Sequence, residues 1–188
     1  MSFTKYLITT SGRKQSALLE EALGYVKDGH FALDLGAGAL NETKYLLSKG
    51  YTVDAVDSEP SFVDFGKNLA ANLIVSTFDT LDFPVGKYDL VNARYALPFN
   101  PPETFNAMFT RLATALKSGG IFIGQLFGLE DSWSDNKEMT FHTKTQVEAL
   151  LDVNGLTILR LEEIKKEGKT ALQGGKFWHV FDIIAKKK

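Results

Sequence analysis

The sequence predicts an α/β fold with a doubly wound, seven-stranded, mostly parallel sheet that closes with a C-terminal antiparallel hairpin. Two observations carry this prediction. Short apolar runs alternate with amphipathic segments over most of the chain, which is typical of consecutive strand–helix units with helices on both faces of a parallel sheet. The C-terminal part instead holds two strand-like segments with no helical pattern between them, which predicts the hairpin.

The first predicted strand ends in a glycine-rich turn. Residues 31–38 read Phe-Ala-Leu-Asp-Leu-Gly-Ala-Gly, so an apolar run leads through Asp34 to Gly36 and Gly38. Glycines let the backbone approach a ligand closely, and the helix predicted over 41–49 offers unpaired amides at its start. Because the Asp34 carboxylate would repel a pyrophosphate, this turn favours a ligand that carries positive charge.

Acids also follow the next two predicted strands. The strand over 51–56 leads to Asp57, and the strand over 72–77 leads to Phe78 and Asp79. The two oxygens of Asp57 can accept hydrogen bonds from both hydroxyls of a ribose, although the residue could instead cap the following helix. Asp79 can accept from an adenine amine while Phe78 covers the ring. These acids predict an adenosine site at one edge of the sheet.

The remaining elements follow from the same two patterns, the one-face spacing of apolar residues in helices and the short apolar runs of strands. One-face helical spacing predicts further helices at 16–27, 62–69, 103–117 and around 147–153, and apolar runs predict strands at 88–93, 121–127, 156–164 and 177–185. The longest irregular segment is 128–143. It follows a strand at the ligand edge, so we expect it to close over a substrate.

Composition limits the function classes. With 188 residues, 44% of them apolar, the chain is expected to form one domain over 1–188. A net charge of −2 gives no field for nucleic acid or an anionic membrane. No segment has the leader pattern or the apolar length of a membrane span, and there is no cysteine, so we expect a cytoplasmic protein, monomeric or weakly dimeric. Three scattered histidines predict no metal site.

Taken together, these motifs resemble those of class I S-adenosylmethionine-dependent methyltransferases, which have a Rossmann-like fold. Residues 34–38 resemble the glycine motif of that family, Asp57 its ribose acid, 78–79 its adenine site, 88–91 its fourth-strand motif and 116–120 the turn before its fifth strand. At a finer level, residues 131–133, 141–143 and 178–181 are similar to small bacterial methyltransferases of the tellurite-resistance type. The chain departs from the family at Leu40, where a third glycine is common, and this side chain could narrow the space beside the methionine moiety.

The resemblance implies S-adenosylmethionine as the cofactor, S-adenosylhomocysteine as its product, and two groups of site residues. The expected cofactor residues are Asp34, Gly36, Ala37, Gly38, Asp57, Ser58, Phe78, Asp79, Thr80 and Asn92, with Arg13 for a ligand carboxylate unless it is only solvated. The expected acceptor residues are Arg94, Tyr95, Trp133 and His142. Tyr95 and His142 are also the candidates for a catalytic base, although a hydrogen bond within its own loop would equally explain His142.

The predicted activity is methyl transfer by in-line displacement to a small-molecule acceptor. Asn100-Pro101-Pro102 is followed by Glu103 rather than an aromatic residue, so it differs from the signature of enzymes that methylate adenine. One alternative is a nicotinamide-dependent oxidoreductase, because Asp57 also lies near the interval that such enzymes use, but Asn41 stands where their third glycine is needed. The other is a cofactor-binding module without transferase activity, for which Leu40 is the hint.

Overall fold

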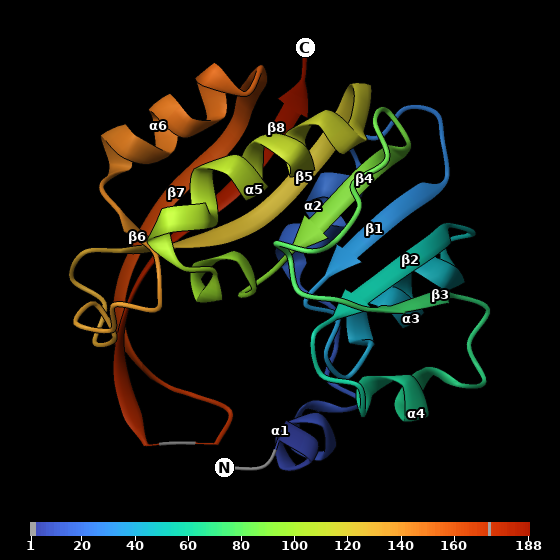
Figure 1. Cartoon of the computed structure of the whole chain (residues 1–188), viewed down its shortest axis with the longest axis horizontal. Coiled ribbons are helices and arrows are strands. Elements are labelled where there is room, and N and C mark those ends of the chain that lie inside the picture. The colour runs from blue at the N-terminus through green and yellow to red at the C-terminus, as the bar shows by residue number, and fades with distance from the viewer. Residues whose placement is uncertain (1–2, 173) are drawn as a thin grey trace.

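The computed structural model describes residues 3–172 and 174–188. Its centre is one eight-stranded sheet in the order β3-β2-β1-β4-β5-β8-β7, with the two-residue β6 pairing β5 outside this path (Figure 1). β1 to β4 pair in parallel, as do β4 and β5, whereas β8 runs antiparallel to both β5 and β7. The strands are β1 (Phe31–Leu35), β2 (Thr52–Asp57), β3 (Asn72–Val75), β4 (Tyr88–Ala93), β5 (Leu116–Gly128), β6 (Phe141–His142), β7 (Leu156–Lys169) and β8 (Gly175–Lys187). The predicted fold class is confirmed.

Helices cover both faces of this sheet. Successive residues of a strand point to opposite sides, so each buried strand packs against helices on both faces. Leu33 and Leu35 of β1 pack in the core cluster that contains α5 and α6, whereas Ala32 packs in the cluster that contains α2 and α3. The helices are α1 (Phe3–Thr10), α2 (Ala17–Leu23), α3 (Asn41–Ser48), α4 (Phe62–Gly66), the 3₁₀ helix η1 (Leu97–Phe99), α5 (Pro102–Ala115) and α6 (Lys144–Val153). Among the described residues, no helix has the length and apolar character needed to cross a membrane.

The C-terminal hairpin is longer than the sequence pattern predicts. β7 and β8 were expected to end at residue 164 and to begin at residue 177, but their pairing continues to Lys169 opposite Gly175. β5 pairs β8 only as far as Val180, so the end of the hairpin extends beyond β5 as a two-stranded arm. Figure 1 shows this arm reaching past the edge of the sheet toward α1. Residues 165–169 are mostly charged and carry no strand alternation, which explains the difference.

Three other elements differ from the prediction. Helix α1 and strand β6 were not expected from the sequence; both are short, and β6 lies in the segment that was predicted to be irregular. The third correction concerns β5, which begins at Leu116 rather than at residue 121. The pairing of β4 with β5 has a bulge between the Tyr88–Leu116 pair and the Leu90–Ile121 pair. The glycine-containing segment 118–120 lies in this bulge and is therefore part of β5.

Leu40 points into the core rather than toward the glycine turn. It has a left-handed backbone conformation, with φ 61° and ψ 29°, and its side chain is fully buried in a cluster with Leu7 and Phe62. Gly66 leaves room for it, because a Cβ at Gly66 would lie 2.8 Å from Leu40 Cδ1. The side chain therefore takes no space beside a ligand at Gly36 and Gly38.

We predict that Leu40→Gly destabilises the protein while leaving affinity at the glycine turn within about threefold. Glycine removes a left-handed strain of about 1 kcal/mol, but the lost leucine leaves a cavity that costs about 2–5 kcal/mol. The free energy of unfolding, measured in urea, should fall by about 2–3 kcal/mol. A variant as stable as the wild type would show that the relieved backbone strain offsets the whole packing loss, which would contradict the packing role of Leu40.

Candidate functional site

The carboxyl ends of the parallel strands open into a cavity of about 1280 Å³. Seven of the predicted cofactor residues line it: Arg13, Gly36, Gly38, Asp57, Ser58, Phe78 and Asp79. The predicted acceptor residues Tyr95 and Trp133 line it as well. A second recess of about 230 Å³ adjoins the glycine turn and is lined by Ala37 and Arg94, together with Arg13 and Tyr95. The structure thus brings most of the predicted site residues to one edge of the sheet.

The glycine turn is held tightly against neighbouring backbone. The amides of Gly36 and Ala37 both donate to the carbonyl of Val56, at distances of 2.9 and 3.0 Å. Gly36 has φ 68°, and a Cβ there would lie 2.5 Å from the Cβ of Ala96. Only glycine fits this position, so the backbone itself forms that part of the cavity wall.

Asp57 joins the end of β2 to this turn. Its Oδ2 accepts from the amide of Gly38 at 2.9 Å, and its Oδ1 accepts from the amide of Glu59 at 3.0 Å. Burial raises the pKa of Asp57, and these backbone hydrogen bonds oppose the rise. Each carboxylate oxygen has further lone pairs, so the side chain can hold the turn and still accept hydrogen bonds from a ligand in the cavity.

Asp34 and Asn92 lie behind the cavity and are absent from its described lining. Asp34 accepts a hydrogen bond from Thr43 Oγ1 at 2.5 Å and another from Asn92 Nδ2 at 2.8 Å. Burial, followed by the charge of Glu42, raises the pKa of Asp34 to about 6, although the two hydrogen bonds lower it. Asn92 Oδ1 is buried without a partner among the described residues. Asp34 was predicted to act on the ligand directly or through water, and its absence from the described lining favours the second of these.

The raised pKa of Asp34 predicts a pH-dependent effect of Asp34→Asn. A carboxyl whose folded pKa is about 6, against 3.8 unfolded, contributes stability that is present below pH 3.8 and is lost as the pH rises to about 6. Asparagine does not titrate and retains a carbonyl that can accept from Asn92. The variant should therefore gain about 3 kcal/mol relative to the wild type between pH 3 and pH 7. Chemical denaturation of both proteins at these pH values measures the difference, and a constant difference would contradict the buried charge.

Arg111 of α5 holds the loop that carries Phe78 and Asp79. Its guanidinium donates to the carbonyls of Phe78, Asp79 and Leu81 at 3.0, 2.9 and 3.1 Å. This positioning residue was missed in the sequence, where it reads as a polar residue on an amphipathic helix. Thr80, by contrast, is exposed, is absent from the described lining and bonds Thr77 Oγ1 at 2.8 Å.

His142 and Arg94 are engaged elsewhere. His142 is buried against Phe105, with ring centroids 4.9 Å apart, and its Nδ1 has no partner among the described residues. Burial lowers the pKa of His142 to about 4, and the residue is absent from the described lining of the cavity. Arg94 Nη1 bonds Glu42 Oε1 at 2.5 Å, and its guanidinium lies over the ring of Tyr95 at 5.5 Å.

Tyr95 stands at the junction of the two recesses. Its backbone is left-handed, with φ 49°, and its side chain is 40% exposed toward the cavity. Burial, followed by the charge of Asp182, raises the pKa of Tyr95. The hydroxyl is therefore protonated at neutral pH and is equipped to donate a hydrogen bond.

An aromatic wall forms the other end of the cavity. We define it as Tyr95, Phe99, Phe127, Trp133 and Trp178, whose contacting rings have centroids 5.7–6.3 Å apart. Phe99, Phe127 and Trp178 were missed as site residues. Phe127 lies at the carboxyl end of a predicted strand, which is a signal that would have identified it. Trp178 lies within the predicted strand 177–185, but the strand pattern does not show that this end of the hairpin lines the cavity.

A buried ion pair supports this wall. Lys176 bonds Asp131, and both side chains are almost completely buried. Lys176 Nζ lies 3.8, 4.1 and 4.8 Å from the ring centroids of Trp178, Trp133 and Phe127. Burial lowers the pKa of Lys176, and Asp131 opposes this. Asp131 also accepts from the amides of Trp133 and His179, so this carboxylate fixes two segments that carry wall residues.

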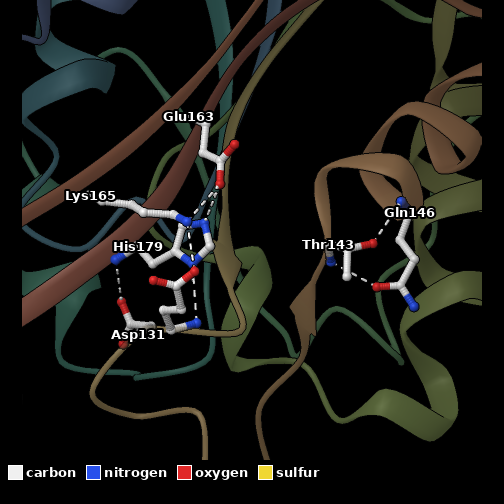
Figure 2. A network of polar contacts seen from close by, with 7 residues as sticks. Asp131, Thr143, Gln146, Glu163, Lys165 and His179 are labelled. Carbon is white, nitrogen blue, oxygen red and sulfur yellow. Dashed lines mark hydrogen bonds and ion pairs between the residues drawn. The ribbon is translucent and has the colours of Figure 1, made fainter.

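His179 lies outside the cavity, because it alternates with Trp178 and Val180 along β8. Figure 2 shows its ring beside Glu163 and near Asp131. Nδ1 accepts from the amide of Glu130 at 3.1 Å, so Nε2 carries the proton and donates to Glu163 Oε1 at 2.9 Å. This arrangement gives His179 a structural role. The described residues hold no group of three or more acidic or histidine side chains that could bind a metal ion.

Comparison with known proteins agrees with this geometry. Residues 32–120 match the family model described as a methyltransferase domain, a range that contains the glycine turn, Asp57 and Asp79. No curated protein sequence matches the chain.

Solved structures share the fold. One is 1,6-didemethyltoxoflavin-N1-methyltransferase from Burkholderia thailandensis with bound 1,6-didemethyltoxoflavin and S-adenosylhomocysteine, at TM-score 0.67, 19% identity, and coverage of 92% of this chain and 79% of that one. An S-adenosylmethionine-dependent methyltransferase from Methanosarcina mazei has TM-score 0.70 and 18% identity, and the match covers 93% of this chain and 99% of that one. TehB from Haemophilus influenzae has TM-score 0.78 and 16% identity, and the match covers 95% of this chain and 64% of TehB.

The residues present fit the cofactor that such a domain uses. Glycine backbone, a carboxylate with free lone pairs and a second acid beside an aromatic ring are the groups that an adenosine needs, and they line one cavity. Residues 32–120 are therefore similar to a methyltransferase domain, and the cavity that they help to line fits S-adenosylmethionine as a cofactor.

Proposed function

We propose that this protein transfers a methyl group from S-adenosylmethionine to a small-molecule acceptor. The observation that carries the proposal is a single cavity with adenosine-binding groups at one end and an aromatic wall at the other. When bound, the cofactor supplies an electrophilic methyl group on a positively charged sulfur. The protein's part is to align this carbon with the acceptor and to exclude water.

In this proposal Gly36 and Gly38 give the close backbone approach, Asp57 accepts from the ribose, and Asp79 with Phe78 holds the adenine. Ser58 lines the same end of the cavity, and Arg13 lies where it can bind the cofactor's carboxylate.

In this proposal Asp34 acts from behind the residues that line the cavity. Its charge favours the positively charged end of the cofactor, and its hydrogen bond fixes Asn92 at the end of β4. Ala37 takes part through its backbone, and Thr80 through the turn that it stabilises with Thr77.

A catalytic base stays a prediction. The place of Tyr95 in the cavity wall supports a role in orienting the acceptor by donating a hydrogen bond. The burial of His142 against Phe105, with its lowered pKa, weighs against a role in binding or deprotonating the acceptor. Arg94 is a candidate for acceptor contact only in the smaller recess, since its guanidinium is paired with Glu42.

Four further expectations belong to this proposal. A small-molecule acceptor agrees with the toxoflavin methyltransferase that shares the fold, and the tellurite-resistance type agrees with the likeness to TehB, which concerns the fold alone at 16% identity. The absence of cysteine supports a cytoplasmic setting, and the net charge of −2 supports an acceptor other than nucleic acid.

Ligand-induced shifts in melting temperature test the proposal against its alternatives. S-adenosylmethionine and S-adenosylhomocysteine should each raise the melting temperature, whereas NAD and NADP should leave it unchanged. The opposite result would favour an oxidoreductase. Formation of S-adenosylhomocysteine, followed by mass spectrometry over a panel of acceptors, then separates a transferase from a module that only binds the cofactor.

A further inference from the structure

The aromatic wall presents free ring surface to the cavity. Phe99 is 53% exposed and Tyr95 is 40% exposed, although both rings line a cavity in which Phe127, Trp133 and Trp178 also participate. The wall is built from four separate segments: the loop after β4 with η1, the end of β5, the loop after β5, and the hairpin arm. Large aromatic side chains left exposed inside a concave site favour an apolar ligand with flat faces.

The position that an organic cation would take against this wall is already occupied. Aromatic faces attract ammonium groups, and three rings around one nitrogen form the usual cage for them. Here the nitrogen is that of Lys176, at 3.8 Å from the Trp178 centroid and 4.1 Å from that of Trp133. Lys176 is 3% exposed and is absent from the described lining of the cavity, so it contacts these rings from behind. The charge of Lys176 is paired with Asp131, and the ring faces that its ammonium group contacts are not open to a second cation.

Few acidic side chains are available to a ligand at the wall, since Asp131, which supports the wall, is paired with Lys176. Among the described residues that line the cavity, the carboxylates are Asp57, Asp79 and Glu167, and the first two belong to the adenosine end. Glu167 is accompanied on the hairpin arm by Lys166 and Lys169. The acceptor end therefore offers ring faces and a slight excess of positive charge, which is the reverse of what a cationic amine requires.

We propose that the acceptor is a planar aromatic compound, neutral or anionic, whose ring lies against the aromatic wall and carries an O–H or N–H group as the methylation site. The proposal rests on the methyltransferase function proposed above. In the transfer, the lone pair of that oxygen or nitrogen forms the bond to the methyl carbon, the carbon–sulfur bond breaks with its electron pair going to sulfur, and the proton passes to solvent.

Three probes of similar size distinguish the properties that the wall selects. 2-Naphthol is planar and neutral, decahydro-2-naphthol is neutral but not planar, and N-methylquinolinium is planar but cationic. Binding is measured by calorimetry in the presence of saturating S-adenosylhomocysteine. Both tryptophans of the chain belong to the wall, so quenching of tryptophan fluorescence by 2-naphthol reports binding at this place. We expect 2-naphthol to bind at least about tenfold more tightly than either of the others.

Matched variants locate the site. Phe99→Leu should weaken 2-naphthol about threefold to tenfold and leave S-adenosylhomocysteine binding unchanged, because it removes one exposed ring of the wall. Phe31→Leu is the control: Phe31 is 45% exposed but lies at the amino end of β1, at the opposite edge of the sheet, and should change neither affinity. Binding of S-adenosylhomocysteine by each variant shows that it is folded.

Two results would overturn the proposal: decahydro-2-naphthol or N-methylquinolinium binding as tightly as 2-naphthol, or Phe99→Leu binding 2-naphthol like the wild type. If S-adenosylhomocysteine fails to bind while 2-naphthol still binds with the expected preference, the methyltransferase proposal falls and the aromatic site stands. If S-adenosylhomocysteine binds but the protein shows no preference for 2-naphthol over the other two probes, the proposal of an aromatic acceptor falls and the methyltransferase proposal stands.

Discussion

Replacing Lys176 with methionine should lower the free energy of unfolding by about 3–5 kcal/mol, because it leaves the Asp131 carboxylate buried without its counter-ion. Methionine keeps the length of the side chain and packs well against aromatic rings, so the loss of charge is the main change. Denaturant unfolding followed by tryptophan fluorescence measures the effect directly, since Trp133 and Trp178 both contact the lysine.

Two comparisons isolate the charge. The double variant Lys176→Met with Asp131→Asn should regain part of the lost stability, because asparagine is uncharged and still has an oxygen that accepts from the amides of Trp133 or His179. Lys188→Met breaks a pair with Asp152 whose side chains are both largely exposed, so it should leave stability nearly unchanged. Equal stability of Lys176→Met and Lys188→Met would contradict the account of the buried pair.

Replacing Asp57 with alanine should weaken S-adenosylhomocysteine binding by about 100-fold or more. In the proposed binding mode, two hydrogen bonds from ribose hydroxyls to the Asp57 carboxylate are lost, at about 1.5–3 kcal/mol each. The variant also removes the acceptor for the Gly38 amide, so the turn loses a contact of 2.9 Å that holds it in shape. Calorimetric titration gives the change in affinity.

The controls for this prediction are Asp57→Asn and Asp64→Ala. Asparagine retains one oxygen and should keep more of the affinity than alanine does. Asp64 is exposed on α4 and absent from the described lining of both recesses, so its loss reproduces the change in net charge alone and should leave affinity unchanged. An Asp57→Ala protein that is folded and binds within threefold of the wild type would remove Asp57 from the site.

The sequence predicted the sheet well because each parallel strand is an apolar run that helices bury on both faces. It also predicted the edge at which the site lies, since a turn or an acid follows β1, β2 and β3 at their carboxyl ends. The part of the hairpin over 165–169 and 175–176 escaped prediction because its residues are charged or small. Helix α1 escaped because it has only eight residues and no acidic first turn or basic last turn to mark it.

Which side chains reach the cavity was harder to predict than where the cavity lies. Asp34 follows the pattern of a ligand-contacting acid, yet hydrogen bonds from Thr43 and Asn92 hold it one layer behind the cavity. His142 follows the pattern of a loop base, yet it lies in β6 and packs against Phe105. Lys176 gives no signal at all, because a single lysine in a charged segment reads as solvated until its ring contacts are known.

The most direct test of the central claim is a calorimetric titration of the wild-type protein with S-adenosylhomocysteine. We expect saturable binding with one site per chain and a dissociation constant in the micromolar range, because a largely formed cavity presents Gly36, Gly38, Asp57 and Asp79 together. No binding at high micromolar ligand, under conditions where the protein is folded, would contradict the assignment of this cavity as the methyl-donor site.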